Sequence, residues 1–249
     1  MIKDLEFIIK KLFFSESYLL EKRLKRAIKN NYEKELQIID RFADKTKDAL
    51  DIGVYRGVYS YKLSRNFKQI HSFEPNPLLY PYLKKNLKKI INNVNLYNIG
   101  LSNKNGQVDL KLPTRSKSIF KDNIEELFKL GAGSIHPGKS FNSFKSIPVK
   151  IKKLDDINLE NNIKFIKIDV EGHEIEVIQG GEKTIKDNKP VLLIEIEKRH
   201  SQRNVEESIS IIKKYGYNCY FTKDNELISS DKLENKEIVN NYFFLPIKS

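Results

Sequence analysis

The segment ALDIGVYRG, residues 49–57, joins a short apolar run to two glycines four residues apart. A helical pattern follows it, from Tyr59 to Asn66. A strand that ends at a glycine ahead of a helix is typical of a βαβ unit, and parallel sheets bind ligands at the carboxyl ends of their strands. The segment lacks the third glycine of the dinucleotide-binding fingerprint, so by itself it also fits a plain turn between strand and helix.

Working outward, short apolar runs alternate with helical segments along the rest of the chain, which predicts an α/β fold with a mostly parallel sheet. The predicted strands are 69–73, 94–99, 165–169, 191–196, 217–222 and 241–245. The predicted helices between them are 78–91, 174–187 and 205–215.

Two regions do not follow this alternation of strands and helices. Apolar residues from Asp4 to Phe42 recur at helical spacing, so residues 1–45 are predicted to be a helical extension, ahead of a main domain at 46–249. Residues 106–152 contain two predicted edge strands, 107–112 and 147–152, around a polar segment. Long loops of this kind are usually functional, so residues 113–146 are interpreted as a lid or acceptor loop.

Composition narrows the class of protein. The 249 residues carry a net charge of +12, from 45 Lys and Arg against 33 Asp and Glu, but only eight of the 45 are Arg. Because the lysines are scattered, the charge alone makes a nucleic-acid partner unlikely. One cysteine, Cys219, excludes a disulfide scaffold. There is no apolar run of membrane-spanning length and no secretory signal at the start, so a cytoplasmic location is expected.

Ionisable residues gather at the ends of the predicted strands. Glu74 ends the second strand, where an acidic side chain can bind both hydroxyls of a ribose, which indicates a nucleoside-type ligand. Lys167, Asp169 and Glu171 follow one another at the end of the 165–169 strand. Part of that cluster also fits a solvated helix start, because acidic residues suit the positive end of a helix. Glu195 and His200 lie at and after the end of the next strand, and His200 is a candidate general base.

Six segments together resemble, in order and spacing, the FkbM family of S-adenosylmethionine-dependent methyltransferases. They are DIG, G and YS within 51–60, FEPNP at 73–77, NIGLS at 98–102, LDD at 154–156, FIKIDVEGHE at 165–174 and LIEI at 193–196. The resemblance implies a class I methyltransferase fold: a Rossmann-like three-layer sandwich around a mostly parallel seven-stranded sheet with an antiparallel last strand. It also implies O-methylation of a hydroxyl on a sugar, glycan or secondary metabolite.

The same resemblance assigns residues to the S-adenosyl-L-methionine site. Carried over by position, the cofactor-binding residues are Asp51, Gly53, Tyr55, Gly57, Glu74, Asn76, Asn98 and Asp169. The loop at 51–57 would hold the methionine portion, Glu74 the ribose, and Asn98 would lie near the adenine. The family usually has Ala-Asn where this chain has Val54-Tyr55. Because Asn tolerates a positive φ better than Tyr, we expect a differently shaped loop here.

The resemblance also suggests a reaction centre. The expected catalytic residues are Asp169, Lys167, Glu171, Glu195 and His200. Asp169 or His200 would remove the hydroxyl proton, and Lys167 would hold the acceptor oxygen or a neighbouring carboxylate, oriented by Glu195. No resident metal is expected; a divalent cation on Asp169, Glu171 and Glu195 is the alternative, because a metal can acidify a hydroxyl.

The acceptor itself is less defined. Lysines at 117, 121, 139 and 145 give the 113–146 segment a basic character that suits an anionic acceptor, such as a phosphorylated or uronic-acid-containing glycan. Three alternatives stay open: a nucleic-acid methyltransferase or binding protein, a non-catalytic nucleoside-binding module, and a nicotinamide-dependent dehydrogenase without the third glycine. The oligomeric state is not predicted.

Overall fold

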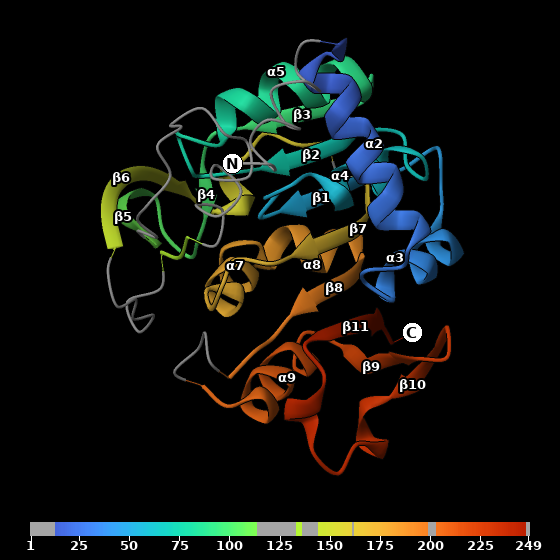
Figure 1. The fold of residues 1–249 in the computed structure, drawn as a ribbon. Helices are drawn as coiled ribbons and strands as arrows, with labels where there is room; N and C mark the ends of the chain where they lie inside the picture. Colours follow the sequence, from blue (N-terminus) through green and yellow to red (C-terminus); the bar gives the residue numbers. More distant parts are fainter. Residues whose placement is uncertain (1–12, 114–132, 136–143, 161, 199–202, 248–249) are drawn as a thin grey trace.

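The computed structural model describes residues 13–113, 133–135, 144–160, 162–198 and 203–247. A large sheet lies between two layers of helices (Figure 1). Its strands are β1 (Asp48–Ile52), β2 (Ile70–Phe73), β3 (Val94–Tyr97), β7 (Ile163–Ile168), β8 (Val191–Glu195), β9 (Tyr217–Lys223), β10 (Glu226–Ser229) and β11 (Asn241–Pro246). The predicted α/β class is therefore confirmed.

The sheet has eight strands in the order β10-β9-β11-β8-β7-β1-β2-β3. The run from β8 to β3 is parallel, and β11 is antiparallel to both β8 and β9. The antiparallel last strand is thus as expected, but the expected number of seven strands is wrong. The additional strand is β10, which forms a hairpin with β9 through Asp224 and Asn225, both at positive φ.

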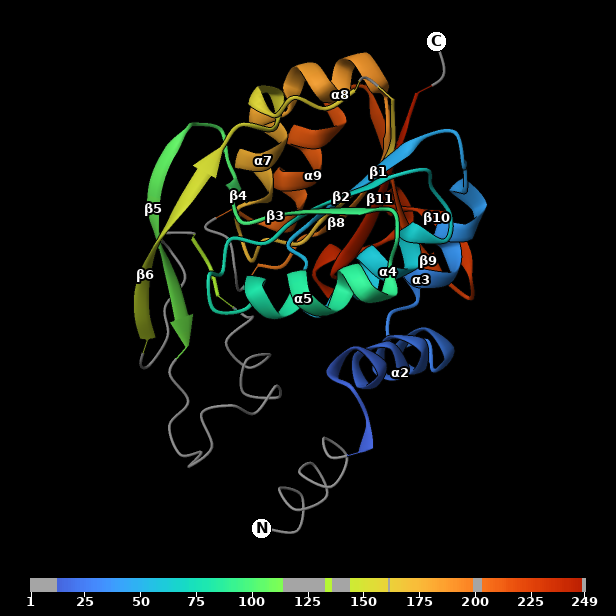
Figure 2. The same ribbon diagram turned by 90° about the horizontal axis from the view of Figure 1, so that it is seen from above.

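Helices cover both faces of the sheet (Figure 2). One face carries α2 (Glu16–Lys29), α3 (Glu35–Ile38), η1 (Ile39–Phe42), α4 (Val58–Ser64) and α5 (Tyr80–Ile90). The other carries α7 (Glu174–Gly180), α8 (Glu182–Asn188) and α9 (Val205–Lys213). Successive strand residues serve opposite faces, so Ala49 packs on the first layer, and Leu50 and Ile52 on the second. The single helix predicted at 174–187 is instead two helices, divided at Gly180 and Gly181.

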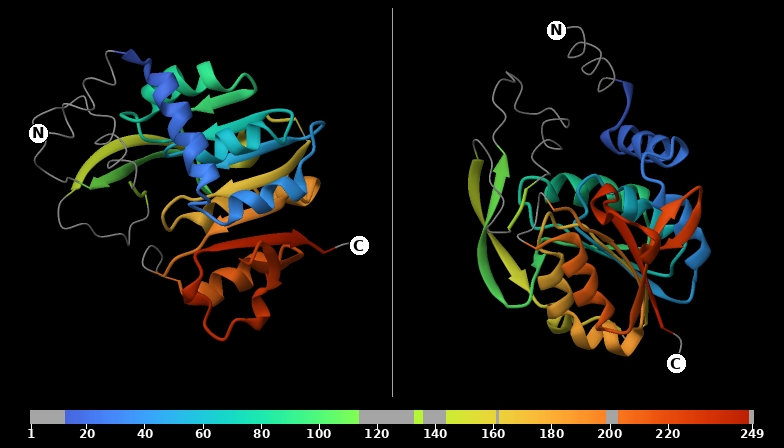
Figure 3. Two further views of the ribbon diagram at one scale, coloured as in Figure 1. Left: turned by 45° about the vertical axis from the view of Figure 1, so that its right-hand side comes forward. Right: turned by 90° about the horizontal axis from the view of Figure 1, so that it is seen from below.

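Helix α2 lies outside α4 and α5, as the outermost element of its layer (Figure 3). The Ser15 hydroxyl caps it by accepting the Tyr18 N–H at 3.2 Å. Its apolar stripe of Leu20, Leu24 and Ala27 is buried against the domain. None of the described helices is long and apolar enough to cross a bilayer.

A second, small sheet lies beyond the carboxyl ends of β1, β2 and β7 (Figure 1). Its strands are β4 (Gly100–Leu101), β6 (Phe144–Lys152) and β5 (Gly106–Pro113), in that order. The two strands predicted here exist, but they belong to this sheet rather than to an edge of the main one. Three short 3-10 turns complete the description: η2 (Leu154–Asp156), η3 (Ser230–Lys232) and η4 (Lys236–Ile238).

Candidate active site

A cavity of about 240 Å³ opens at the carboxyl ends of β1, β2 and β7. Polar groups and apolar side chains alternate around it. The lining residues are Ile52, Gly53, Tyr55, Phe73, Glu74, Pro75, Asn76, Ile99, Gly100, Leu101, Leu110, Gly133, Ile135, Asp169, Val170 and Glu171. This cavity lies where an open parallel sheet binds its ligands, and we call it the first cavity.

Glu74 is the buried acid of the first cavity. One carboxylate oxygen accepts the Tyr55 N–H at 3.0 Å, and the other accepts the Asn76 N–H at 2.8 Å. Burial raises the pKa of Glu74 to about 7, although these two hydrogen bonds act against the rise. A carboxylate has about four acceptor positions, so Glu74 can still accept two hydroxyl donors from a ligand.

The turn after β1 depends on residues in the left-handed region. Gly53 has φ +90, and a Cβ there would lie 1.8 Å from the Asp169 backbone oxygen, so only glycine fits between the two strand ends. Tyr55 has φ +49, the left-handed conformation that an Asn would adopt more readily. The bulkier residue therefore does not remove the positive φ from this loop, and its N–H still reaches Glu74.

Three of the predicted cofactor residues support the first cavity without lining it. Asp51 is 1 % exposed and accepts a 2.5 Å hydrogen bond from the Ser60 hydroxyl at the start of α4. Gly57 begins α4 at φ +80, against Leu87. Asn98 uses its side-chain amide to donate to the Glu74 and Pro75 carbonyls, at 2.9 and 3.2 Å. It holds the turn after β2, while Ile99 and Gly100 supply the neighbouring cavity wall.

A second cavity, of about 550 Å³, lies between α2 and the turn after β1. Its lining residues are Leu20, Arg23, Leu24, Arg26, Ala27, Tyr32, Glu33, Leu36, Gly53, Val54, Tyr55, Arg56, Val58, Tyr59 and Asp169. Gly53, Tyr55 and Asp169 line both cavities. The two cavities are therefore adjacent, and Asp169 is the acidic residue on the wall that they share.

Lys167 lies behind Asp169. It is 1 % exposed, with its Nζ 3.9 Å from Asp169 Oδ2 and 3.1 Å from Asn241 Oδ1, to which it donates. The Nζ also lies over the Tyr59 ring, 4.8 Å from its centroid. Burial lowers the pKa of Lys167, but the surrounding carboxylates, chiefly Asp169 and Glu195, outweigh it and the net pKa is raised. The Lys167 ammonium therefore lies next to Asp169, and Lys167 lines neither cavity.

Glu195 is the second carboxyl group of this cluster and is hydrogen-bonded to Asp169. Burial raises the pKa of Glu195 well above its usual range, and the neighbouring Asp169 raises it further. The protonated form of Glu195 is therefore favoured, and in that form its carboxyl group can donate a hydrogen bond to Asp169. Like Lys167, it lines neither cavity.

Two residues that had no predicted role complete the cluster. The buried Tyr59 hydroxyl donates to Glu33, in the connection between α2 and α3. Burial raises the pKa of Tyr59 well above its usual range, and Glu33 adds to the effect. Asn241, at the start of β11, is paired with Glu195 across the strands. These residues come from segments far apart in sequence. Tyr59 belongs to the YS pair of the resemblance, which gave it no role, and no local motif indicated Glu33 or Asn241.

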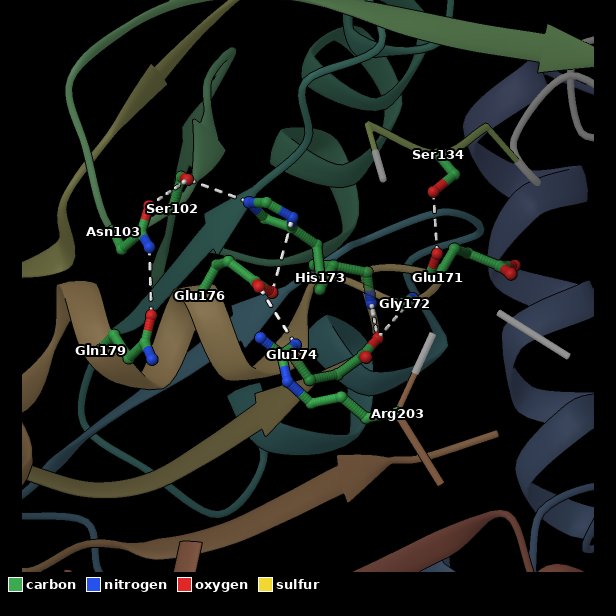
Figure 4. Close-up of polar contacts among 11 residues, drawn as sticks. Ser102, Asn103, Ser134, Glu171, Gly172, His173, Glu174, Glu176, Gln179 and Arg203 are labelled. Carbon is green, nitrogen blue, oxygen red and sulfur yellow. Dashed lines mark hydrogen bonds and ion pairs between the residues drawn. The ribbon is translucent and has the colours of Figure 1, made fainter. Parts of the chain in front are cut away.

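Glu174 holds the loop that precedes α7 by accepting hydrogen bonds from its backbone (Figure 4). The Glu174 Oε1 accepts the Gly172 N–H at 2.9 Å and the Val170 N–H at 3.3 Å. Glu174 is buried, which raises its pKa to about 7. The acidic residues at this helix start include Glu174 and were also expected to fit a solvated helix start, and for Glu174 that alternative is wrong. Glu171 lies in this loop at φ +58 and lines the first cavity.

Ser134 and His173 connect the same loop to the small sheet (Figure 4). The Ser134 hydroxyl donates to the Glu171 carbonyl at 2.8 Å, and Ser102 Oγ lies 2.9 Å from His173 Nε2. Ser102 is 1 % exposed, so this Ser-His pair is a structural contact rather than a nucleophile and its base. The part of the 113–146 segment that contains Lys117, Lys121 and Lys139 lies outside the described residues.

Two further expectations concern the reaction centre. Among the residues that the structure describes, no group of three or more His, Cys, Asp or Glu could hold a metal ion, so Asp169, Glu171 and Glu195 do not form the alternative metal-ligand set. His200 lies outside the described residues. Asp169 is thus the described candidate base that lines both cavities.

Comparison with known proteins bears on the family and the fold of this chain. Residues 51–219 match the family model of the methyltransferase FkbM domain. Methyltransferase sdnD of Sordaria araneosa is 28% identical over 152 residues, which are 53% of this chain and 59% of that protein. The crystal structure of methyltransferase FkbM from Methylobacillus flagellatus KT superposes on this chain with a TM-score of 0.51 and 15% identity. The matched region is 80% of this chain and 44% of that protein's chain. The latter likeness establishes the fold. This chain spans less than two thirds of the length of either relative.

Proposed function

The chain belongs to the methyltransferase FkbM domain family, and on that premise we propose that it transfers the methyl group of S-adenosyl-L-methionine to a hydroxyl oxygen. The proposed acceptor is a sugar, a glycan or a secondary metabolite. The observation that carries this proposal is the position of Asp169, on the wall shared by the first and second cavities. A donor in one cavity and an acceptor in the other would face each other across this carboxyl group.

The residues of the first cavity suit the cofactor. Glu74 is a buried acid with acceptor positions left for a ribose diol, and Phe73, Ile99 and Leu101 offer apolar surface for a nucleobase. Gly53 has no side chain, so the backbone can approach the ligand closely. When bound, S-adenosyl-L-methionine supplies a methyl group activated by its sulfonium.

In the proposed reaction, Asp169 accepts the proton of the acceptor hydroxyl as the oxygen–carbon bond forms and the carbon–sulfur bond breaks. Holding the two reactants in adjoining cavities replaces a bimolecular encounter with a positioned one. Glu195 donates to Asp169, and Lys167 supplies positive charge behind it. We assign these two as positioning residues, because neither lines a cavity.

The first test concerns Asp169 and its substitution Asp169→Asn. We expect cofactor affinity, measured by calorimetric titration with S-adenosyl-L-methionine, to stay nearly unchanged. Turnover, measured as S-adenosylhomocysteine release in a screen of sugar acceptors, should fall by about 10²–10⁴-fold, the usual contribution of a general base. Glu182→Gln, on the exposed face of α8, is the control for loss of one acidic charge.

Each result has a defined meaning. Unchanged turnover in Asp169→Asn would remove Asp169 from the mechanism and move the role of base to His200, which His200→Ala would then test. Binding of S-adenosyl-L-methionine without transfer to any acceptor would favour a non-catalytic nucleoside-binding module. Parallel titrations with NAD and ATP establish whether the first cavity discriminates among nucleoside ligands.

A further inference from the structure

The basic side chains that line the second cavity are unusual for this protein. Arg23, Arg26 and Arg56 are on its wall, and all the cations among its described lining residues are arginines. The chain has only eight arginines against 37 lysines, so lysine is the ordinary cation of this protein. Three of the eight arginines therefore meet at one cavity. Arginine differs from lysine by its planar fork of donors, which matches a carboxylate or a phosphate with two parallel hydrogen bonds.

The three arginines come from two opposing walls. Arg23 and Arg26 are three residues apart on α2, so they share a face of that helix. Arg56 lies in the turn after β1, with its guanidinium 4.9 Å from the centroid of the Tyr55 ring. Figure 3 shows α2, in blue, on the outside of its helix layer. A ligand that enters between α2 and the turn would meet guanidinium groups from both sides.

The wall of the second cavity carries acidic residues as well as arginines. Glu33 and Asp169 line the same cavity as the arginines. The two acids repel an anion and can accept hydrogen bonds from hydroxyl groups. An acceptor with an anionic group and separate hydroxyls would therefore place its anion at the arginines and a hydroxyl at Asp169.

We infer that the acceptor carries a phosphate or carboxylate group, which the arginines of the second cavity bind while α2 forms one wall of the acceptor site. This inference rests on the proposed function, since it uses Asp169 as the point of transfer. It places the anion site on α2 and the turn after β1, in addition to the predicted basic segment at 113–146. The helical extension is then part of the active site as well as a packing element.

The test compares three probes that share a hexose frame: glucose 6-phosphate, glucuronate and glucose. Binding of each is measured by saturation-transfer NMR with the full chain. We expect the phosphorylated or the carboxylated sugar to bind and glucose to bind at least about tenfold more weakly, as the loss of a charge-assisted hydrogen bond would cause. The two anionic probes distinguish a phosphate acceptor from a carboxylate acceptor.

Variants locate the binding. Arg26→Gln and Arg56→Gln should each lower the affinity for the preferred anionic sugar by about tenfold, and Arg26→Lys should recover only part of it, because lysine lacks the fork. Arg41→Gln is the matched control, since Arg41 binds Glu226 at the far edge of the sheet. The preference for an anionic sugar should persist in Arg41→Gln.

Titration of the same variants with S-adenosyl-L-methionine separates this inference from the proposed function. Loss of the anionic sugar with retained cofactor binding in Arg26→Gln supports the anion site. Equal binding of all three probes, no binding of either anionic probe, or an unchanged preference in both Arg26→Gln and Arg56→Gln overturns it. Failure of every variant and the parent chain to bind the cofactor would instead contradict the proposed function.

Discussion

At the scale of single residues, the reaction centre follows from the alternation of side chains along strands. Asp51, Lys167 and Glu195 come from adjacent strands, and each points to the sheet face that carries α2 and α4. Asp51 is opposite Lys167 in the register of β1 and β7. The buried Lys167 ammonium is stabilised chiefly by Asp169, whose Oδ2 lies 3.9 Å from the Lys167 Nζ.

The protonation of Glu195 leads to a prediction for Glu195→Gln. If Glu195 is protonated at pH 7, as its raised pKa implies, glutamine preserves its neutral charge and its ability to donate to Asp169. We therefore expect the unfolding free energy of Glu195→Gln at pH 7 to be close to that of the parent chain. Glu195→Ala, which removes the donor, should cost about 1–3 kcal/mol. Urea unfolding at pH 7 measures both variants.

An ionised Glu195 would give a different result for the same variants. If Glu195 were ionised, glutamine would remove an anion that balances Lys167, and Glu195→Gln would be as destabilising as Glu195→Ala. In that case the Lys167 ammonium would be left without a balancing anion. Adding Lys167→Met to Glu195→Gln should then restore the unfolding free energy.

Sequence reasoning identified some site residues better than others. Glu74, Gly53 and Asp169 follow strand ends directly, so position along the chain was enough to place them at the sheet edge. Glu33 and Asn241 reach the cluster only through tertiary packing, and no local pattern indicated them. The arginines at 23, 26 and 56 also left no local signal, because the eight arginines are spread along the chain and only the fold brings these three to one cavity.

At the scale of elements, α2 connects stability to the acceptor cavity. Leu24 is 2 % exposed and lies on the buried stripe of α2, beside the arginines that line the second cavity. Leu24→Ala should lower the unfolding free energy by about 2–5 kcal/mol. Because it loosens the wall of the second cavity, it should also weaken binding of the preferred anionic sugar while leaving S-adenosyl-L-methionine binding unchanged.

Ile212→Ala is the matched control for this prediction. Ile212 is fully buried on α9, in the helix layer on the opposite face of the sheet. The substitution should cost a similar unfolding free energy without affecting the sugar. Equal loss of sugar binding in both variants would mean that general destabilisation, and not the position of α2, controls the second cavity.

Two departures from the predicted elements have local causes. The strand β10 was missed, although Asp224 and Asn225 are residue types that tolerate the consecutive left-handed conformations of a tight hairpin turn. The helix predicted at 174–187 is divided where Gly180 packs on the Ser102 carbonyl, which a Cβ would approach to 1.9 Å. Gly180 and Gly181 indicate a break in the helix. The apolar residues on both sides of this pair nevertheless keep the helical spacing, which predicted a single helix.

At the scale of the whole molecule, buried carboxyl groups make stability depend on pH. Burial raises the pKa of Asp51, Glu74 and Glu174 to about 7 each, above the value in an unfolded chain. Their contribution to stability is present below the unfolded pKa, near 4, and is lost as the pH rises through 7. His71 acts in the other direction, because burial lowers its pKa.

We therefore predict that the three carboxyl groups favour folding at pH 5.5 over pH 8, and that Glu174→Gln reduces this difference. Glutamine can still accept both loop N–H groups, which contact a single oxygen of Glu174. The effect per group is on the order of 1 kcal/mol for each pH unit between the two pKa values. Urea unfolding at both pH values measures it, with Glu182→Gln as the control that should not change the slope.

The two outer strands of the main sheet also affect how the protein behaves at high concentration. Both β3 and β10 have four residues, and β10 begins with the charged Glu226. Arg41 binds the Glu226 carboxylate at 2.8 and 3.0 Å and the Asn225 carbonyl at 2.6 Å, so it fixes the hairpin end against η1. A short, charged and immobilised edge is a poor template for another chain. The β10 edge is therefore protected against edge-to-edge association with another sheet.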